Sequence, residues 1–247
     1  MGSRKAVGMG WACKTELQDE SLKGSFVEAA NADLSVQGSS GVRSEVDEQK
    51  LPIIFLASRS PRRREFLLAA GIEHEAEHPG VEDSILVPGD VSPSQWVMSL
   101  AYLKAQAGAA LIPGKHRLVI GADTTCVVDG RMVGTPRDAA EAREIIRGFV
   151  GRSHDVLTGV AIVDSISGAR EMFWDRATVV FGNLEVAQIE EYIATGAWAG
   201  KAGAYNLAER VAAGWPIVTS GDETTVMGLP MKKLQARLAA RRIRQVD

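Results

Sequence analysis

Ile53-Ile54-Phe55-Leu56-Ala57-Ser58-Arg59-Ser60-Pro61-Arg62-Arg63-Arg64 joins a short apolar run to a polar turn and three arginines. The apolar run, residues 53–57, predicts a strand buried on both faces, as in α/β sheets. Ser60 is a favoured N-cap, Pro61 a favoured first helical residue and Gly71 a favoured stop, so a helix is predicted from Pro61 to about Ala70. A strand, a tight turn and a helix in this order indicate an α/β fold.

Helical and strand patterns alternate along the rest of the chain. The capping-box spacing that begins at Ser92 predicts a helix to about Leu111. Its inward face is expected to carry Trp96, Leu100 and Leu103. Further strands are predicted at residues 118–122, 126–128, 132–133, 155–163 and 171–181, further helices at 138–149, 186–195 and 231–244, and Gly-rich connections at 196–203 and 214–228. Because the two long strands are expected to be antiparallel, the pattern predicts a mixed twisted sheet with flanking helices and two lobes around a central cleft.

The composition is that of an ordinary globular protein. The 247 residues are 45% hydrophobic and 24% charged, and the net charge of -3 argues against general nucleic-acid or membrane-surface partners, which need a basic field. Cys13 and Cys126 lie far apart and form no disulfide framework or zinc motif. No stretch approaches the roughly 20 apolar residues of a membrane helix. We therefore expect a cytoplasmic protein without nucleic-acid or membrane partners.

Residues 1–50 differ in composition from the remainder. They are rich in Ser, Gly and acidic residues and have no sustained apolar period, which predicts a disordered N-terminal extension. A natural leader and a mis-assigned start codon are equally open. A mitochondrial presequence fits less well because acidic residues such as Glu16 and Asp19 interrupt it. A single folded domain is expected from Leu51 to Asp247.

Arg62, Arg63 and Arg64 fall in the first turn of the predicted helix. The helix dipole disfavours each cation there by about 0.3–1 kcal/mol. A bound anion would offset this cost, because backbone N–H groups and guanidinium forks suit phosphate oxygens, and the Ser58 and Ser60 hydroxyls add donors. Since successive helical residues are rotated by about 100°, Arg62 and Arg63 are expected to face the ligand and Arg64 the solvent. The alternative is a solvated basic face without a ligand.

Asp123 follows the predicted strand 118–122, at the end where α/β proteins place ligand-binding groups. It is a candidate base that activates water, or a candidate ligand of Mg²⁺. The alternative is an aspartate that caps a turn. Lys104 in the second helix and Lys201 in a Gly-rich loop are either ligand-binding cations or ordinary surface lysines.

Six motifs follow one another between residues 51 and 239. They are Leu56-Ala57-Ser58-Arg59-Ser60-Pro61-Arg62-Arg63, Leu100-Ala101-Tyr102-Leu103-Lys104-Ala105, Gly121-Ala122-Asp123-Thr124, Gly151-Arg152-Ser153-His154-Asp155-Val156-Leu157-Thr158-Gly159, Lys201-Ala202-Gly203-Ala204-Tyr205 and Gly228-Leu229-Pro230. The set resembles the Maf family of nucleoside triphosphate pyrophosphatases, and its Lys-Ala-Gly-Ala-Tyr motif resembles the branch acting on dTTP and UTP. The resemblance implies an inosine-triphosphatase-like fold. It also implies a water attack assisted by a divalent metal, Mg²⁺ or Mn²⁺, that releases a nucleoside monophosphate and pyrophosphate.

The resemblance also implies roles for particular residues. Asp123 matches the proton acceptor and a metal ligand, and Asp83, with Glu82 as the adjacent alternative, matches a second acidic ligand. Arg62 and Thr124 match positions that tune the choice of base. Substrate-binding positions are matched by Ser58, Arg63, Lys104, Lys201 and Glu209. Whether the protein forms a homodimer is left open by the sequence.

Two positions depart from the family pattern. Thr135 stands where relatives usually carry a lysine, so a phosphate-neutralising charge is absent unless Arg131 or Arg137 replaces it. Ala208 and then Glu209 stand where the pyrimidine branch has a glutamine. These departures keep a second hypothesis open, a catalytically weak nucleotide-binding regulator of cell division. A third, an enzyme of other phosphoesters, rests on the phosphate-binding turn alone.

Overall fold

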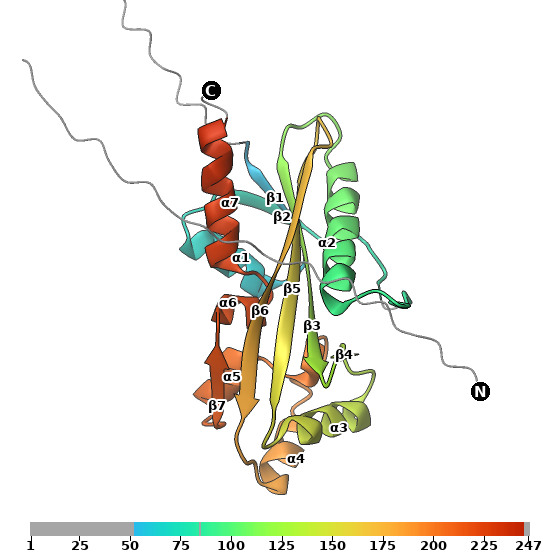
Figure 1. The fold of residues 1–247 in the computed structure, drawn as a ribbon, viewed down its shortest axis with the longest axis vertical. Coiled ribbons are helices and arrows are strands. Elements are labelled where there is room, and N and C mark those ends of the chain that lie inside the picture. Colours follow the sequence, from blue (N-terminus) through green and yellow to red (C-terminus); the bar gives the residue numbers. More distant parts are fainter. Residues whose placement is uncertain (1–51, 84, 245–247) are drawn as a thin grey trace, which may run out of the picture. The chain divides into compact units, whose positions relative to one another are not determined.

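The computed structural model describes residues 52–83 and 85–244, the last three by their backbone alone. The expected N-terminal extension, residues 1–50, lies outside the described residues. Within them, seven strands form one mixed sheet in the order β2-β1-β3-β5-β6-β7, with β4 paired to β3. Helices flank this sheet (Figure 1), which confirms the predicted α/β fold class. The division into two lobes stays a prediction.

The elements agree with the sequence pattern over most of the described chain. The strands are β1 (Ile54–Ala57), β2 (His74–Glu77), β3 (Leu118–Val128), β4 (Arg131–Val133), β5 (Ser153–Asp164), β6 (Arg170–Phe181) and β7 (Ile217–Ser220). The helices are α1 (Pro61–Ala69), α2 (Pro93–Ala110), α3 (Ala139–Phe149), α4 (Val186–Ala194), α5 (Leu207–Ala212), α6 (Glu223–Val226) and α7 (Met231–Arg244), with a 3₁₀ turn η1 (Ala202–Ala204). The segment predicted as a connection at 214–228 instead contains β7 and α6, and α5 was not predicted.

Strand β3 corrects the prediction of two separate strands around Asp123. Its first residues pair in parallel with β1, as Leu118 does with Ile54, whereas residues 118–127 pair antiparallel with β5. Asp123 and Thr124 therefore lie inside the strand, since the long β5 continues the ladder beside them. The last β3 residue that pairs with β1 is Ile120, so Asp123 still lies where the parallel neighbour has ended.

Helix α2 packs on the sheet through small residues. The capping box at Ser92 is present as predicted, but Leu103 is 45% exposed, so its predicted inward position is wrong. The buried residues of this helix are Val97, Leu100, Ala101, Ala105 and Gly108. A Cβ atom at Gly121 of β3 would lie 2.6 Å from the Ala105 backbone nitrogen, so the helix backbone approaches the sheet closely. Small residues of α2 therefore lie at the closest contact with the sheet, and Leu103 lies outside it.

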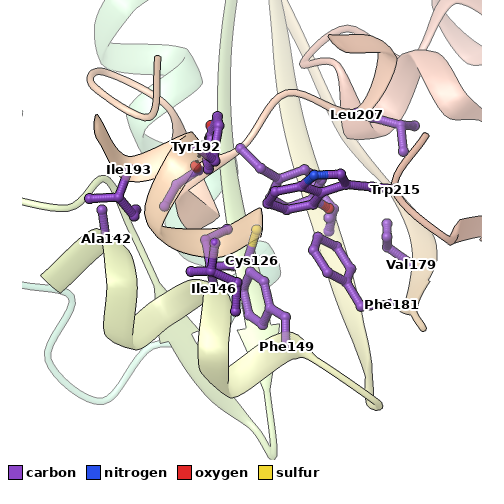
Figure 2. Close-up of a cluster of buried hydrophobic side chains, with 14 residues drawn as sticks. Cys126, Ala142, Ile146, Phe149, Val179, Phe181, Tyr192, Ile193, Leu207 and Trp215 are labelled. Carbon is purple, nitrogen blue, oxygen red and sulfur yellow. Dashed lines mark hydrogen bonds between the residues drawn. The ribbon is translucent and has the colours of Figure 1, made fainter. Parts of the chain in front are cut away.

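Buried side chains gather in three clusters within the described residues. One lies under α1 and α7 and includes Leu56 and Leu234, and another lies under α2 and includes Val119. The third is rich in aromatic residues and joins the far ends of β3, β5 and β6 to α3 and α4, as Figure 2 shows around Phe149 and Phe181. Among the described helices, none combines the length and apolar character needed to span a membrane.

Candidate active site

A cavity of about 760 Å³ lies beside the carboxyl end of β1. Its walls come from the turn after β1, the first turn of α1, the middle of β3, the segment around α5 and the end of α6 as far as Gly228. The structure brings all the sequence-predicted site residues together in this lining: Ser58, Arg62, Arg63, Asp83, Lys104, Asp123, Thr124, Lys201 and Glu209.

The N-terminus of α1 opens on this cavity. Its first turn contains no acidic residue, and the Ser60 side chain makes no capping hydrogen bond. Instead the Ser60 backbone N–H donates to Ser58 Oγ at 3.1 Å, which holds the turn in shape. The unneutralised dipole and the arginines of the first turn give this end of the cavity a positive field that suits an anion.

Arg63 is held by groups from three parts of the chain. It donates from Nε to the Gly228 carbonyl oxygen at 2.7 Å, from Nη1 to Ser58 Oγ at 3.2 Å and from Nη2 to Thr124 Oγ1 at 3.5 Å. Burial lowers its pKa from the ordinary value, and the nearby Asp123 carboxylate opposes that shift. These contacts fix the guanidinium at the cavity wall.

The other two arginines of this turn differ in position. Arg62 lines the cavity, as expected, and Arg64 does not. Arg64 is nevertheless half-buried and donates from Nη2 to the Ser58 carbonyl oxygen at 3.5 Å. Arg64 is therefore not fully exposed to solvent as expected, because its guanidinium contacts the turn that precedes the helix.

Lys104 reaches from α2 to two carboxylates. Its Nζ lies 2.6 Å from Asp123 Oδ1 and 2.5 Å from Asp83 Oδ2. Burial raises the pKa of Asp123 above its usual value, while the ammonium of Lys104 and the guanidinium of Arg63 act in the opposite direction. A partly desolvated carboxylate beside two cations is a group that can accept a proton from bound water.

The same two carboxylates fit a divalent cation. The carboxylates of Asp83 and Asp123 contact one common position, which the Lys104 ammonium occupies. Mg²⁺ is usually held by one or two carboxylates and completes its shell with water and substrate phosphates. Among the described residues no group of three or more His, Cys, Asp or Glu side chains could hold a metal by itself. Asp83 and Asp123 are thus two carboxylates of the cavity lining that could take part in holding such a cation.

A chain of hydroxyl groups behind the cavity was missed from the sequence. Thr124 Oγ1 and Thr158 Oγ1 lie 2.8 Å apart, and Thr158 Oγ1 donates to the Thr225 carbonyl oxygen at 2.7 Å. Thr225 Oγ1 in turn donates to Asp175 Oδ2 at 2.6 Å. Thr158 belongs to a motif noted above, but only the β3–β5 register, which pairs it with Thr124, reveals the contact.

Lys201 forms an ion pair inside the cavity lining. Its Nζ donates to Glu209 Oε2 at 2.7 Å, and Asn206 Nδ2 donates to Glu209 Oε1 at 2.5 Å. Asn206 was also missed from the sequence, although Asn206-Leu207-Ala208-Glu209 has the spacing of a helix start with a Glu at the third position. Its Oδ1 accepts the Ala208 backbone N–H and caps α5.

Thr135 lines the cavity, whereas Arg131 and Arg137 do not. Arg137 is 84% exposed and is paired with Glu141 at 2.8 Å. Neither arginine therefore replaces the cation that the family resemblance places at residue 135.

Fold and cavity together define an open α/β protein with a charged cleft at the carboxyl end of a parallel strand. Residues 53–241 match the family model described as Maf-like protein, and the chain belongs to this family, as its motifs predicted. It is 40% identical over 181 residues to the dTTP/UTP pyrophosphatase of Pelotomaculum thermopropionicum, a match that covers 73% of this chain and 92% of that protein. The identity is 43% to the dTTP/UTP pyrophosphatase of Symbiobacterium thermophilum, with 73% and 89% covered, and 34% to that of Burkholderia pseudomallei, with 76% and 93% covered.

Proposed function

We propose that the protein hydrolyses dTTP and UTP to the nucleoside monophosphate and pyrophosphate. The observation that carries the proposal is the partly buried Asp123 carboxylate, which shares one cavity with the cations Lys104 and Arg63. The names of the similar enzymes support the same reaction and the same bases.

The chain's own groups account for the positioning of the substrate. The first turn of α1, with Arg62 and Arg63, binds the phosphate oxygens, because a helix N-terminus and guanidinium forks suit them. Asp123 accepts the proton of the attacking water. As the water oxygen bonds to the α-phosphorus, the bond from that phosphorus to the bridging oxygen breaks and pyrophosphate leaves. Lys104 and Arg63 stabilise the charge on the oxygens as this occurs.

A divalent cation, Mg²⁺ or Mn²⁺, would be held by Asp83 and Asp123. It would supply further charge neutralisation at the phosphate oxygens. Three expectations remain predictions. They are a location in the cytoplasm, the absence of nucleic-acid and membrane partners, and a homodimer.

The test is product analysis on the purified full-length chain. It is incubated with dTTP, UTP, CTP, ATP or GTP in Mg²⁺, Mn²⁺ or EDTA, and nucleotides and pyrophosphate are separated by anion-exchange chromatography. Equimolar UMP and pyrophosphate are expected from UTP. The Asp123→Asn variant is expected to lose about 10²–10⁴-fold in kcat. Release of UDP and phosphate would contradict the proposal.

The matched control is Asp129→Asn. Asp129 lies in the β3–β4 turn with a φ of 49°, a conformation that asparagine tolerates, and it does not line the cavity. It is expected to retain the wild-type rate.

The hypothesis of a weakly active regulator rests on Thr135 and on the Lys201–Glu209 pair, which reduce the free positive charge of the cavity. Tight nucleotide binding without turnover, unchanged by Asp123→Asn, would favour it over hydrolysis.

A further inference from the structure

Three polar side chains form a row across the sheet behind the cavity. Thr124 of β3 is paired with Thr158 of β5, and Thr158 is paired with Asp175 of β6. Residues that are paired across neighbouring strands project from the same face of a sheet, so the three side chains lie next to one another. Thr124 lines the cavity, whereas Thr158 and Asp175 do not. The row therefore connects the cavity wall with strand β6.

The hydrogen bonds around this row run in one direction. Burial acts to raise the pKa of Asp175, but hydrogen bonds to its carboxylate outweigh burial and lower the pKa, so the ionised group accepts from Thr225 Oγ1 at 2.6 Å. Thr158 Oγ1 uses its proton on the Thr225 carbonyl oxygen at 2.7 Å. Thr124 Oγ1, 2.8 Å from Thr158 Oγ1, must therefore donate to it. The Thr124 oxygen then offers only lone pairs on its other side, where Arg63 Nη2 donates.

Thr225 attaches helix α6 and the turn after it to this row, and its side chain is fully buried. Its hydroxyl is bound to Asp175, and its carbonyl oxygen accepts both the Thr158 hydroxyl and the Gly228 backbone N–H, the latter at 3.1 Å. Gly228 has a φ of 100°, which favours glycine, and a Cβ atom there would lie 3.3 Å from Arg63 Nε. The place of Gly228 beside Arg63 therefore depends on the contacts of Thr225.

We propose that Asp175 is a positioning residue for Arg63, an inference that rests on the function proposed above. Asp175 fixes Thr225, and Thr225 fixes the turn that contains Gly228. The Gly228 carbonyl oxygen then accepts Arg63 Nε at 2.7 Å and holds the guanidinium in one orientation. A guanidinium that is already oriented loses less conformational freedom when it binds phosphate oxygens. Asp175 thus acts on the substrate through two other residues and does not touch it.

The test removes one hydroxyl group. Thr225→Val keeps the shape of the side chain but has no proton for Asp175. The value of kcat/KM for UTP is expected to fall about tenfold to a hundredfold, because a small displacement of a substrate-positioning group lowers the rate steeply. Thr225→Ser keeps the hydroxyl and is expected to have nearly the wild-type value. If Thr225→Val does not fold, Asp175→Ala breaks the same contact at a partly exposed residue and is expected to give the same loss.

A double-mutant cycle shows whether the effect passes through Arg63. In an Arg63→Ala background there is no guanidinium to position, so the addition of Thr225→Val is expected to lower kcat/KM little further. A loss by the same factor in both backgrounds would mean that Thr225 acts on something other than Arg63, and it would overturn the inference. An unchanged kcat/KM in Thr225→Val alone would overturn it as well.

The matched control is Thr178→Val. Thr178 lies on the same strand as Asp175 and donates from Oγ1 to another aspartate, Asp155 Oδ1, at 2.7 Å. Neither of these two residues lines the cavity. Thr178→Val is expected to keep the wild-type kcat/KM, even where urea unfolding shows that it loses as much stability as Thr225→Val. An equal loss of kcat/KM in both variants would show a general structural effect and would contradict the positioning role.

A wild type that cleaves no nucleotide would contradict the proposed function instead. The positioning of Arg63 is then tested by calorimetric binding of pyrophosphate, which requires no turnover. Weaker binding to Thr225→Val than to Thr178→Val, with no such difference in the Arg63→Ala background, would support the inference. Equal affinities of the two variants would overturn it.

Discussion

Lys104 Nζ lies 2.6 Å from Asp123 Oδ1, although helix α2 and strand β3 place these residues on different layers of the fold. The same nitrogen lies 2.5 Å from Asp83 Oδ2, so one ammonium holds two carboxylates together. Without this cation the two carboxylates would repel one another in a partly desolvated site. Lys104 therefore controls both the position and the basicity of Asp123.

Lys104→Met is expected to raise the pKa of Asp123 further, because burial already raises it and Lys104 is the largest opposing influence. The carboxylate form then persists only at higher pH, so the acid limb of the pH profile of kcat/KM should move to higher pH. Activity is lost most strongly on the acid side. The profile is measured on UTP. Lys233→Met, which removes a lysine paired with Asp175 outside the cavity, is the control and should leave the limb unchanged.

Thr135→Lys is expected to increase activity. Thr135 is exposed and lines the cavity, so a lysine there adds a cation near the substrate without being buried. KM for UTP should fall roughly threefold to tenfold at low salt and less at high salt, because exposed charges are screened. Thr195→Lys, at the exposed end of α4, is the control. An equal effect of both substitutions would show that only net charge matters.

Gly121→Ala is expected to destabilise the fold by about 1–3 kcal/mol or more, because the new Cβ meets the α2 backbone rather than a flexible side chain. The variant should also lose activity, since α2 carries Lys104. Gly148→Ala near the end of α3 meets nothing within 4 Å and should be neutral or stabilising by up to about 1 kcal/mol. Urea unfolding of both variants measures the difference, and similar stabilities would contradict the packing described for α2.

His154 is expected to make stability depend on pH. Burial lowers its pKa from 6.5 to about 4, and its Nε2 lies 2.9 Å from Tyr205 Oη. The unfolded chain therefore binds a proton between these pH values that the folded chain does not. Stability should be complete above pH 6.5 and should fall as the pH drops toward 4. His154→Gln should flatten this dependence in urea unfolding at pH 7 and pH 5, whereas His116→Gln, at an exposed histidine, should retain the wild-type slope.

The sequence was most informative where local chemistry decides the structure. The turn from Ser58 to Pro61 and the capping box at Ser92 depend on neighbouring residues, and both predicted helices begin where expected. Leu103 was misplaced because the inward face of α2 is set by Gly121 on another element. A helical period shows that one face is apolar. It does not show that the partner surface admits only small side chains.

The candidate site shows the same contrast between features set by neighbouring residues and features set by distant elements. Sequence patterns identified residues that now line one cavity, but their pairings depend on distant segments. The contact between Thr124 and Thr158 follows from the register of β3 and β5, which no local pattern specifies. The ion pair between Lys201 and Glu209 depends on α5, whose start at Asn206 has a readable cap signal that was overlooked beside a Gly-rich segment.

The hydrogen bond from Arg63 to the Gly228 carbonyl oxygen joins residues that are 165 positions apart. During synthesis, Arg63 leaves the ribosome long before its partner exists. The arginine cannot be fixed at the cavity wall until nearly the whole domain has emerged. A nascent chain that stops before residue 228 would contain the basic turn but not the carbonyl oxygen that holds Arg63. We therefore expect nucleotide hydrolysis only once synthesis has passed residue 228.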